Sequence, residues 1–350
     1  MTAKQKKILV TGGAGYIGSH TVVELYNAGY QPVIVDNFSN SEKSVLEGLK
    51  AILGHSVKLY EGDCNDEAFL KNVFQQEQNI TGIIHFAAYK AVGESVQKPL
   101  EYYQNNVASL MTLLKIMQTF QVSHLVFSSS CTVYGQPDKL PVTEQSPKKT
   151  TESPYGNTKQ ICEEILEDLV KSQAPLKAIA LRYFNPIGAH PSAHIGELPL
   201  GVPNNLVPFI MQTAFGIREK LTVNGNDYNT PDGTCIRDYI HVVDLAKAHV
   251  QSLTYLDSIK EENCLDIFNI GTGRGHSVME VINTFEQIRK EPLNYTVGPR
   301  RSGDVEQVYA NVDKAEELLN WSAELSLEKA LIDAWRWQES LGLKHNRIDA

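Results

Sequence analysis

The fold of this chain is decided by residues 7–18, which read KILVTGGAGYIG. The first five residues form a short apolar run with a β-branched end, which is typical of a buried strand. Four glycines follow, of which Gly12, Gly15 and Gly18 are spaced three residues apart along the chain. Apolar residues then recur at helical spacing over 22–26. The stretch therefore predicts a strand, a tight turn and a helix.

The same alternation continues through the first half of the chain. Short runs in which nearly every residue is apolar recur along the sequence. The later runs are separated by stretches in which apolar residues follow helical periodicity. Such strands are typical of a parallel sheet covered by helices on both faces. We therefore expect an α/β fold with a doubly wound parallel sheet of the Rossmann type. The further strands are expected near 32–36, 57–60, 82–86 and 124–128, and two of the helices near 70–74 and 107–117.

A change in residue composition near residue 185 predicts a second domain. Beyond the apolar run at 178–181, prolines and glycines become frequent. We expect residues 1–185 to form the first domain and residues 186–350 a smaller mixed α/β domain. The apolar run at 266–270 is expected to return as a strand to the first sheet.

Composition bounds the function. Of 350 residues, 42% are hydrophobic and 21% are charged, which indicates a folded protein rather than a disordered one. With 32 basic and 41 acidic residues the net charge is −9, which argues against sequence-independent binding of nucleic acid. Five separated cysteines form no metal-binding pattern, so we expect no metal and reduced thiols. No signal peptide or membrane-spanning run is recognised, so we expect a cytoplasmic protein.

The glycine turn predicts a site for a dinucleotide. Glycines at a strand-to-helix turn let the backbone approach a pyrophosphate, and the helix N-terminus supplies N–H groups. Asp36 ends the second strand, where a carboxylate can hold both hydroxyls of an adenosine ribose. A 2′-phosphate would be repelled there, so NAD is favoured over NADP.

A second group of residues predicts catalysis. Ser153 and Pro154 can begin a helix that carries Tyr155 and, one turn later on the same face, Lys159. A tyrosine serves as a base near neutral pH only if its pKa is lowered, and a neighbouring ammonium acts in that direction. The segment at 127–135 ends another strand with hydroxyl side chains, at the edge where such sheets bind ligands.

These motifs resemble the extended short-chain dehydrogenase/reductase superfamily, and within it the UDP-glucose (UDP-galactose) 4-epimerase family. The resemblance covers almost the whole chain, and it implies that residues 1–185 form an NAD-binding domain and residues 186–350 a UDP-sugar-binding domain. Its further motifs are FAAYKAVGES at 86–95, RYFNP at 182–186, DGTCIRDYIH at 232–241 and RRSGD at 300–304.

The resemblance implies four catalytic residues, Ser130, Thr132, Tyr155 and Lys159. It implies NAD as the cofactor, bound by Gly12, Gly15, Tyr16, Ile17, Gly18, Asp36, Asn37, Asp63, Cys64, Phe86, Ala87, Ala88, Lys90, Asn105, Ser130, Tyr155, Lys159 and Phe184. The UDP-sugar would be bound by Lys90, Ser130, Tyr155, Asn185, Asn205, Leu206, Asn224, Arg237, Arg301, Asp304 and Val308. Two of these are arginines, which suit a pyrophosphate in an otherwise acidic protein.

By the same resemblance the activity is reversible interconversion of UDP-galactose and UDP-glucose through a 4-keto intermediate, with NAD retained. Tyr155 would move the O4 proton, Ser130 and Thr132 would bind O4, and Lys159 would bind the nicotinamide ribose and lower the Tyr155 pKa. Val308 stands where the family helps decide what fits at the sugar C2, so UDP-N-acetylhexosamines are further candidate substrates. A homodimer through helices such as 107–117 is also implied.

Three alternatives stay open. A nucleotide-sugar 4,6-dehydratase would need an acidic pair after the strand-end threonine, whereas this chain has Ser130, Cys131 and Thr132 there. A uronate epimerase or another NAD-linked reductase would share most of these motifs. A non-catalytic dinucleotide sensor should lack the pair Tyr155 and Lys159.

Overall fold

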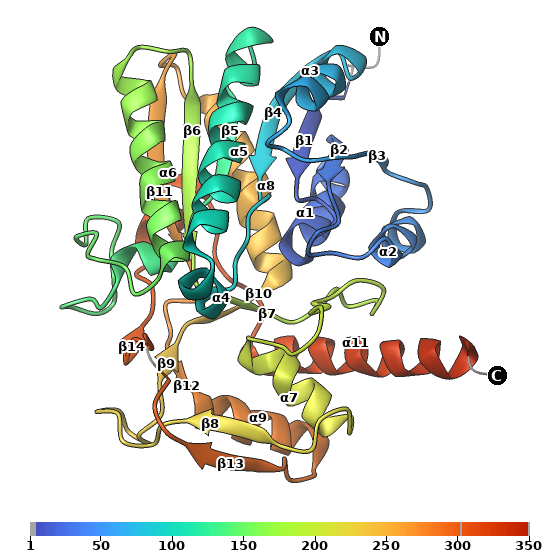
Figure 1. Ribbon diagram of the computed structural model, residues 1–350, viewed down its shortest axis with the longest axis vertical. Coiled ribbons are helices and arrows are strands. Elements are labelled where there is room, and N and C mark those ends of the chain that lie inside the picture. Colours follow the sequence, from blue (N-terminus) through green and yellow to red (C-terminus); the bar gives the residue numbers. More distant parts are fainter. Residues whose placement is uncertain (1–4, 302, 349–350) are drawn as a thin grey trace.

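The computed structural model describes residues 5–301 and 303–348, and it has two lobes, each built around its own sheet (Figure 1). The larger lobe holds a seven-stranded sheet in the order β11-β6-β5-β4-β1-β2-β3, in which every neighbouring pair is parallel. This confirms the predicted doubly wound fold. The strands are β1 (Lys7–Thr11), β2 (Gln31–Asp36), β3 (Lys58–Glu61), β4 (Ile80–His85), β5 (His124–Ser128), β6 (Lys177–Tyr183) and β11 (Cys264–Ile270).

Successive residues of β1 explain why the sheet is covered on both faces. Ile8 and Val10 pack on one face and Leu9 on the other, and all three are buried. One face is covered by α1 (Tyr16–Asn27), α2 (Ser44–Leu53), α8 (Val242–Ser258) and α10 (Asp313–Leu319). The other is covered by α3 (Glu67–Gln76), α5 (Pro99–Thr119) and α6 (Pro154–Lys171).

The chain crosses between the lobes more than once. The apolar run expected at 266–270 lies within β11, which pairs with β6 over its whole length. Helix α8 packs against α1, so it also belongs to the larger lobe, although it follows residue 185. The larger lobe is therefore completed by segments from the second half of the sequence.

The smaller lobe has its own apolar core. Two short strands, β8 (Leu221–Asn224) and β13 (Tyr295–Gly298), pair in parallel beside α7 (Leu206–Ala214), α9 (Val278–Arg289) and α11 (Leu327–Ile348). Between the lobes lie β7 (Asn185–Ile187) with β10 (Tyr239–His241), and β9 (Ile236–Arg237) with β12 (His276–Ser277) and β14 (Gln307–Val308). The carboxyl ends of the large sheet's strands face this region, where α4 (Val92–Gln97) also lies (Figure 1). The 3-10 helix η1 (Cys131–Tyr134) follows the carboxyl end of β5.

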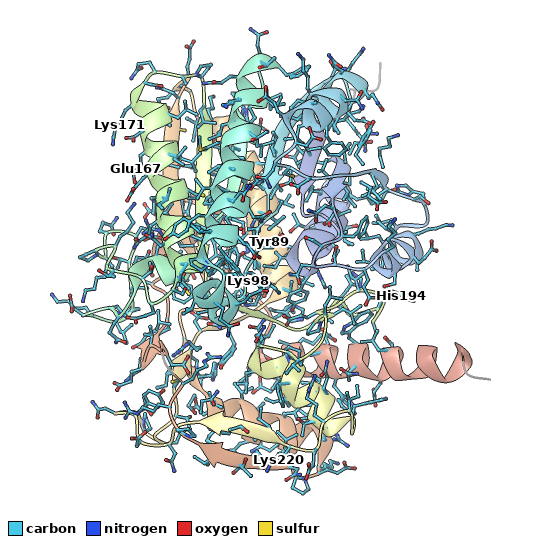
Figure 2. The ribbon with its side chains drawn as sticks, viewed as in Figure 1. Tyr89, Lys98, Glu167, Lys171, His194 and Lys220 are labelled. Carbon is cyan, nitrogen blue, oxygen red and sulfur yellow. The ribbon has the colours of Figure 1, made fainter. Side chains whose placement is uncertain are left out.

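The order of the strands places a crevice at one point of this edge. From β1 the chain continues to β2 and β3 on one side, whereas β4, β5 and β6 lie on the other. Ligands of open α/β sheets bind where the winding reverses in this way. Tyr89 and Lys98, which follow β4 in the chain, lie close to the point where the winding reverses (Figure 2).

Candidate active site

A cleft of about 1360 Å³ runs between the lobes along the carboxyl ends of the strands. It is lined by most of the residues predicted from the sequence. They are Gly12, Gly15, Tyr16, Ile17, Gly18, Asp36, Asn37, Asp63, Cys64, Phe86, Ala87, Ala88, Lys90, Asn105, Thr132, Tyr155, Lys159, Asn185, Asn205, Arg237, Arg301, Asp304 and Val308.

The glycine turn at the start of α1 has no room for side chains. A Cβ on Gly18 would lie 2.2 Å from the carbonyl oxygen of Gly12. Gly12 itself has a φ of +69°, and a Cβ there would lie 2.8 Å from the Ala87 nitrogen. The N-cap residue Gly15 offers no side chain, and the first turn of α1 carries no acidic residue. The N–H groups and positive end of this helix thus remain available to an anion, which fits the pyrophosphate of NAD.

Asp36 connects this turn to the next loop. Its carboxylate accepts hydrogen bonds from the Ala14 N–H at 2.9 Å, the Phe38 N–H at 2.9 Å and the Ser41 hydroxyl at 3.0 Å. The side chain is held in one orientation at the wall of the cleft, at the end of β2. A carboxylate fixed in this place fits the ribose hydroxyls of NAD and disfavours a 2′-phosphate.

Helix α6 presents Tyr155 and Lys159 to the cleft. The Ser153 hydroxyl caps the helix by accepting a hydrogen bond from the Gly156 N–H at 3.3 Å, and Pro154 occupies its first position. Lys159 donates to the Ser128 carbonyl at 2.7 Å, which ties the helix to the end of β5. Burial lowers the pKa of Lys159 to about 8. The predicted helix start and pairing are therefore present.

The pKa of Tyr155 differs from the expectation. Burial raises it well above its ordinary value, and the neighbouring Tyr183 adds to that effect, while a hydrogen bond with Ser130 opposes it. The ammonium of Lys159 lies 5.8 Å from the centre of the tyrosine ring. In the chain by itself burial therefore sets the direction of this pKa, and the contribution of Lys159 to it stays a prediction.

Four predicted residues lie outside the cleft wall. Ser130 is buried behind it, where its hydroxyl accepts a hydrogen bond from the Thr132 hydroxyl at 3.0 Å. Phe184 packs into a separate apolar cluster with Val133 and Tyr134, because it follows Tyr183 and takes the opposite side of the chain.

Leu206 and Asn224 complete this group of four. The Leu206 side chain packs on the core of the smaller lobe. Its backbone N–H, at the first position of α7, is the group that could reach a ligand. Asn224 is exposed at the end of β8, where its backbone pairs with Gly298.

One acidic and two basic side chains meet at the wall of the cleft. Asp304 accepts a hydrogen bond from Arg301 at 2.6 Å, and its carboxylate lies 3.7 Å from Arg237. The three side chains leave one net positive charge. Paired guanidinium groups of this kind suit a diphosphate through forked hydrogen bonds.

Sequence reasoning missed a buried ion pair that positions α6. Glu163 accepts hydrogen bonds from Arg182 at 2.9 and 2.6 Å and from the Ser129 hydroxyl at 2.6 Å, and both charged side chains are at most 2% exposed. This network fixes α6 against β5 and β6. An arginine at the end of an apolar strand was the available signal, because a charge buried there needs a partner.

Tyr183 was also missed. It lines the cleft beside Tyr155, and its hydroxyl is 2.7 Å from that of Ser128. Burial raises the Tyr183 pKa to about 12, so it stays a neutral phenol. Cys131 lines the cleft as well, and burial raises its thiol pKa to about 12, which disfavours a nucleophilic role. In the part of the chain that the structure describes, no group of His, Cys, Asp and Glu side chains is arranged to hold a metal.

Comparison with known proteins agrees with this geometry. Residues 9–333 match a family model described as GDP-mannose 4,6 dehydratase. A UDP-glucose 4-epimerase of Dictyostelium discoideum is 50% identical over 332 residues, which cover 95% of each chain.

Two solved structures are similar to this chain. The UDP-glucose 4-epimerase of Bifidobacterium longum, solved with NAD+ and UDP, is 47% identical with a TM-score of 0.91, covering 96% of this chain and 98% of that one. The enzyme of Stenotrophomonas maltophila, solved with NAD and a formylated UDP-arabinopyranose, is 43% identical with a TM-score of 0.93, covering 97% and 100%. The fold, the cleft and these relatives together place the chain in the UDP-glucose 4-epimerase family.

Proposed function

We propose that this chain interconverts UDP-galactose and UDP-glucose by inverting C4 of the sugar, with NAD retained between turnovers. The observation that carries the proposal is the single cleft in which the glycine turn, Asp36, the pair Tyr155 and Lys159, and the arginines of the smaller lobe meet. The relatives at 47–50% identity are epimerases of this kind.

Three side chains in or behind the cleft wall have separate roles in moving the O4 proton. Tyr155 takes the proton from the sugar O4 as a 4-keto sugar forms, and it returns that proton when C4 is reduced on the opposite face. Thr132 lines the cleft beside it, and Ser130 supports the tyrosine hydroxyl from behind. Bound NAD+ would accept and return the C4 hydride and would bring a positive charge that opposes the effect of burial on Tyr155.

The larger lobe would bind the cofactor, and the smaller lobe would bind the nucleotide sugar. In the larger lobe the predicted cofactor residues that line the cleft would bind NAD, and Lys159 would bind the nicotinamide ribose. In the smaller lobe Arg237 and Arg301 would hold the diphosphate of UDP, and Asn185 and Asn205 would hydrogen-bond the nucleotide sugar. We also propose the division of the chain at residue 185, with 242–270 returning to the NAD-binding lobe.

The described site gives no support to a dehydratase, although the matching family model carries that description. Elimination of water across C5 and C6 needs an acid and a base beside the strand-end hydroxyl. At that place the chain has Cys131, whose buried thiol is neutral at ordinary pH because its pKa is raised to about 12.

We further propose a homodimer and a reducing compartment. Leu100 and Met111, both on α5, are exposed by 81% and 44%, which suits a contact with a second copy of the chain. All five cysteines are free, as is usual in the cytosol. Among residues 5–301 and 303–348, no helix is both long enough and apolar enough to cross a membrane. Light scattering of the purified protein tests the dimer.

A coupled assay tests the proposed activity. Purified protein is given UDP-galactose without added NAD, and the reaction is stopped by heat. The UDP-glucose formed is then measured in a second step with UDP-glucose dehydrogenase and its own NAD+. We expect sustained turnover, together with nicotinamide nucleotide released on denaturation. An enzyme that turns over only with stoichiometric NADH would be an ordinary reductase and would contradict the proposal.

A further inference from the structure

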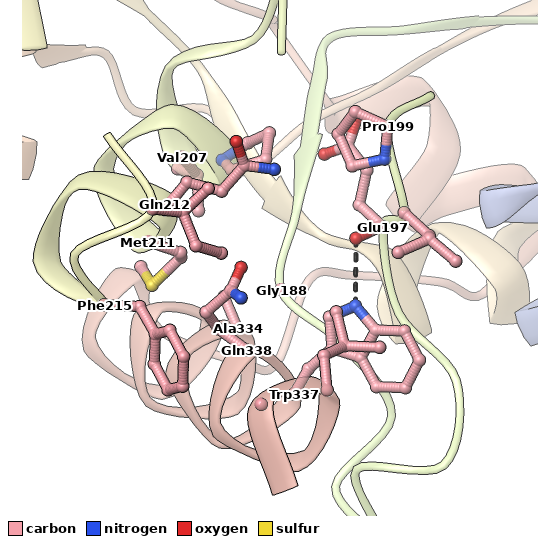
Figure 3. Close-up of a pocket in the computed structure, with 15 residues that line it drawn as sticks. Gly188, Glu197, Pro199, Val207, Met211, Gln212, Phe215, Ala334, Trp337 and Gln338 are labelled. Carbon is pink, nitrogen blue, oxygen red and sulfur yellow. Dashed lines mark hydrogen bonds between the residues drawn. The ribbon is translucent and has the colours of Figure 1, made fainter. Parts of the chain in front are cut away.

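Glu197 lies in the segment between β7 and α7, and its backbone is fixed from behind. The Trp337 indole of α11 donates a hydrogen bond of 2.9 Å to the Glu197 carbonyl (Figure 3). A Cβ on the preceding Gly196 would lie 2.5 Å from the Trp337 ring, so this segment packs directly on the ring. On its other side the segment meets the larger lobe, where a Cβ on Gly48 would lie 2.2 Å from the His194 carbonyl oxygen. The backbone of Glu197 is therefore held in one position, which fixes where its side chain starts.

One oxygen of the Glu197 carboxylate serves both lobes. Its Oε1 accepts a hydrogen bond from the Asn205 amide at 2.8 Å and lies 3.5 Å from the Lys90 ammonium. The Glu197 side chain is only 11% exposed, whereas that of Lys90 is 49% exposed. A carboxylate this poorly solvated depends on its partners, so it constrains both of them.

The bond to Asn205 has a consequence for α7. Asn205 is the N-cap residue of this helix, and asparagine there commonly accepts a hydrogen bond from the first turn. In this structure the Asn205 side chain makes no such bond. Its amide donates to Glu197 instead, so the first-turn N–H groups of α7 have no side-chain cap.

We propose that Glu197 is a positioning residue for the nucleotide sugar, which holds the Asn205 amide away from the cap of α7 so that this amide and the first-turn N–H groups face the UDP diphosphate. This inference rests on the proposed function, because it assumes that a UDP-sugar occupies the cleft.

The charges explain why a carboxylate is tolerated beside an anionic ligand. A negative charge near a diphosphate is unfavourable unless a cation offsets it. Lys90 supplies that cation from the larger lobe, at the position predicted to contact both NAD and the sugar nucleotide. Glu197 thus joins the two halves of the site through a pair that forms across the cleft.

Two variants separate hydrogen bonding from charge. Glu197→Gln keeps an acceptor for Asn205, whereas Glu197→Ala removes it and leaves the Asn205 side chain free to cap α7. The readout is the Kd of UDP, measured by calorimetry on NAD-loaded protein, with KM and kcat for UDP-galactose measured in parallel. Glu324→Ala is the matched control, because Glu324 pairs with Lys247 on the surface away from the cleft.

We expect Glu197→Ala to weaken UDP binding by about 5-fold and to raise KM similarly with little change in kcat, as expected for loss of a positioning hydrogen bond. Glu197→Gln should stay within about 2-fold of the native protein. Asn205→Ala should weaken binding as much as Glu197→Ala, and the double variant should be no weaker than either single one, because both remove the same arrangement.

The inference is overturned if Glu197→Ala leaves the Kd of UDP within twofold of the native value. It is also overturned if the effects of Glu197→Ala and Asn205→Ala add, or if Glu197→Ala lowers only the melting temperature. UDP binding does not depend on turnover. A native protein without epimerase activity would therefore contradict the proposed function alone, and unchanged UDP binding in an active Glu197→Ala variant would contradict this inference alone.

Discussion

The ammonium of Lys159 lies 5.8 Å from the centre of the Tyr155 ring, one turn further along α6. Its hydrogen bond goes to the Ser128 carbonyl at 2.7 Å rather than to the tyrosine hydroxyl. Lys159 therefore anchors the helix to the sheet and places a charge over the ring, while burial dominates the Tyr155 pKa. The reactivity of Tyr155 thus depends on what is bound in the cleft as well as on its neighbours in the chain.

Replacement of Tyr155 tests its role as the group that moves the O4 proton. Tyr155→Phe should lower kcat by about 10²–10⁴-fold, because general acid–base catalysis contributes that much, while the buried ring keeps its packing. UDP binding and NAD content should stay close to native, as measured by calorimetry and by release of nucleotide on denaturation. An unchanged kcat in the folded variant would remove Tyr155 from the mechanism.

Ser130 should affect the same step through the Tyr155 pKa. Its hydrogen bond lowers that pKa, so Ser130→Ala should raise it and shift the acidic limb of the kcat profile to higher pH. The loss of rate should be smaller than in Tyr155→Phe, because the proton-transferring group remains. Ser172→Ala, at the far end of α6, is the control. If the pH profile of Ser130→Ala overlays that of the native enzyme, the hydrogen bond has no catalytic role.

The buried His249 predicts loss of stability in mild acid. Burial lowers its pKa from 6.5 to about 4, so the folded state keeps the ring neutral where the unfolded chain binds a proton. Its stabilising effect is complete above the unfolded pKa and is lost as pH falls from about 6.5 to about 4. At pH 5 this loss is about 2 kcal/mol for one such histidine.

Urea unfolding at pH 7 and pH 5 measures this effect. His249→Leu should narrow the difference in unfolding free energy between the two pH values by about 2 kcal/mol relative to the native protein. His55→Leu replaces an exposed histidine and serves as the control. Equal pH dependence in the native protein and in His249→Leu would show that His249 is not protonated on unfolding.

Much of the fold could be predicted because its signals are local. Near-continuous apolar strands and helical periodicity gave the large sheet, and the glycine spacing gave the turn at α1. The pairing of β8 with β13 could not be predicted in this way, because it joins Leu221 to Tyr295 through contacts distant in sequence. Strands of four residues carry too little periodicity to identify their partners.

The site was predicted mainly where residue type alone restricts the role. Asp36 and Lys159 were found because their chemistry and their place after a strand or on a helix agree. Glu197 was missed, since a glutamate in a loop is usually a solvated surface charge. Only the fold shows that Trp337 and Asn205 hold it at the cleft. The raised pKa of Tyr155 was likewise hidden, because burial is a property of the packed structure.

Val308 is the basis of a prediction about substrate range. Its side chain lines the cleft, is 6% exposed and packs with Phe184 and Val133. A valine leaves more room than an aromatic side chain, so we expect measurable epimerisation of UDP-N-acetylglucosamine and UDP-N-acetylgalactosamine. Val308→Tyr should lower kcat/KM for these sugars by more than for UDP-glucose and UDP-galactose.

The comparison requires kcat/KM for both sugar pairs in the native protein and in Val308→Tyr, with NAD content verified in each. Absence of N-acetyl activity in the native enzyme, or an unchanged ratio in the variant, would show that Val308 does not control the space at C2.

In the proposed mechanism the C4 hydrogen leaves the sugar as hydride and returns to the same carbon without exchange with solvent. The most direct measurement supplies UDP-galactose deuterated at C4 in ordinary water and follows the UDP-glucose product by mass spectrometry and NMR. If the proposed mechanism is correct, the product keeps its deuterium at C4. Replacement of that deuterium by hydrogen from solvent would mean that C4 is inverted through proton exchange, and it would contradict the account.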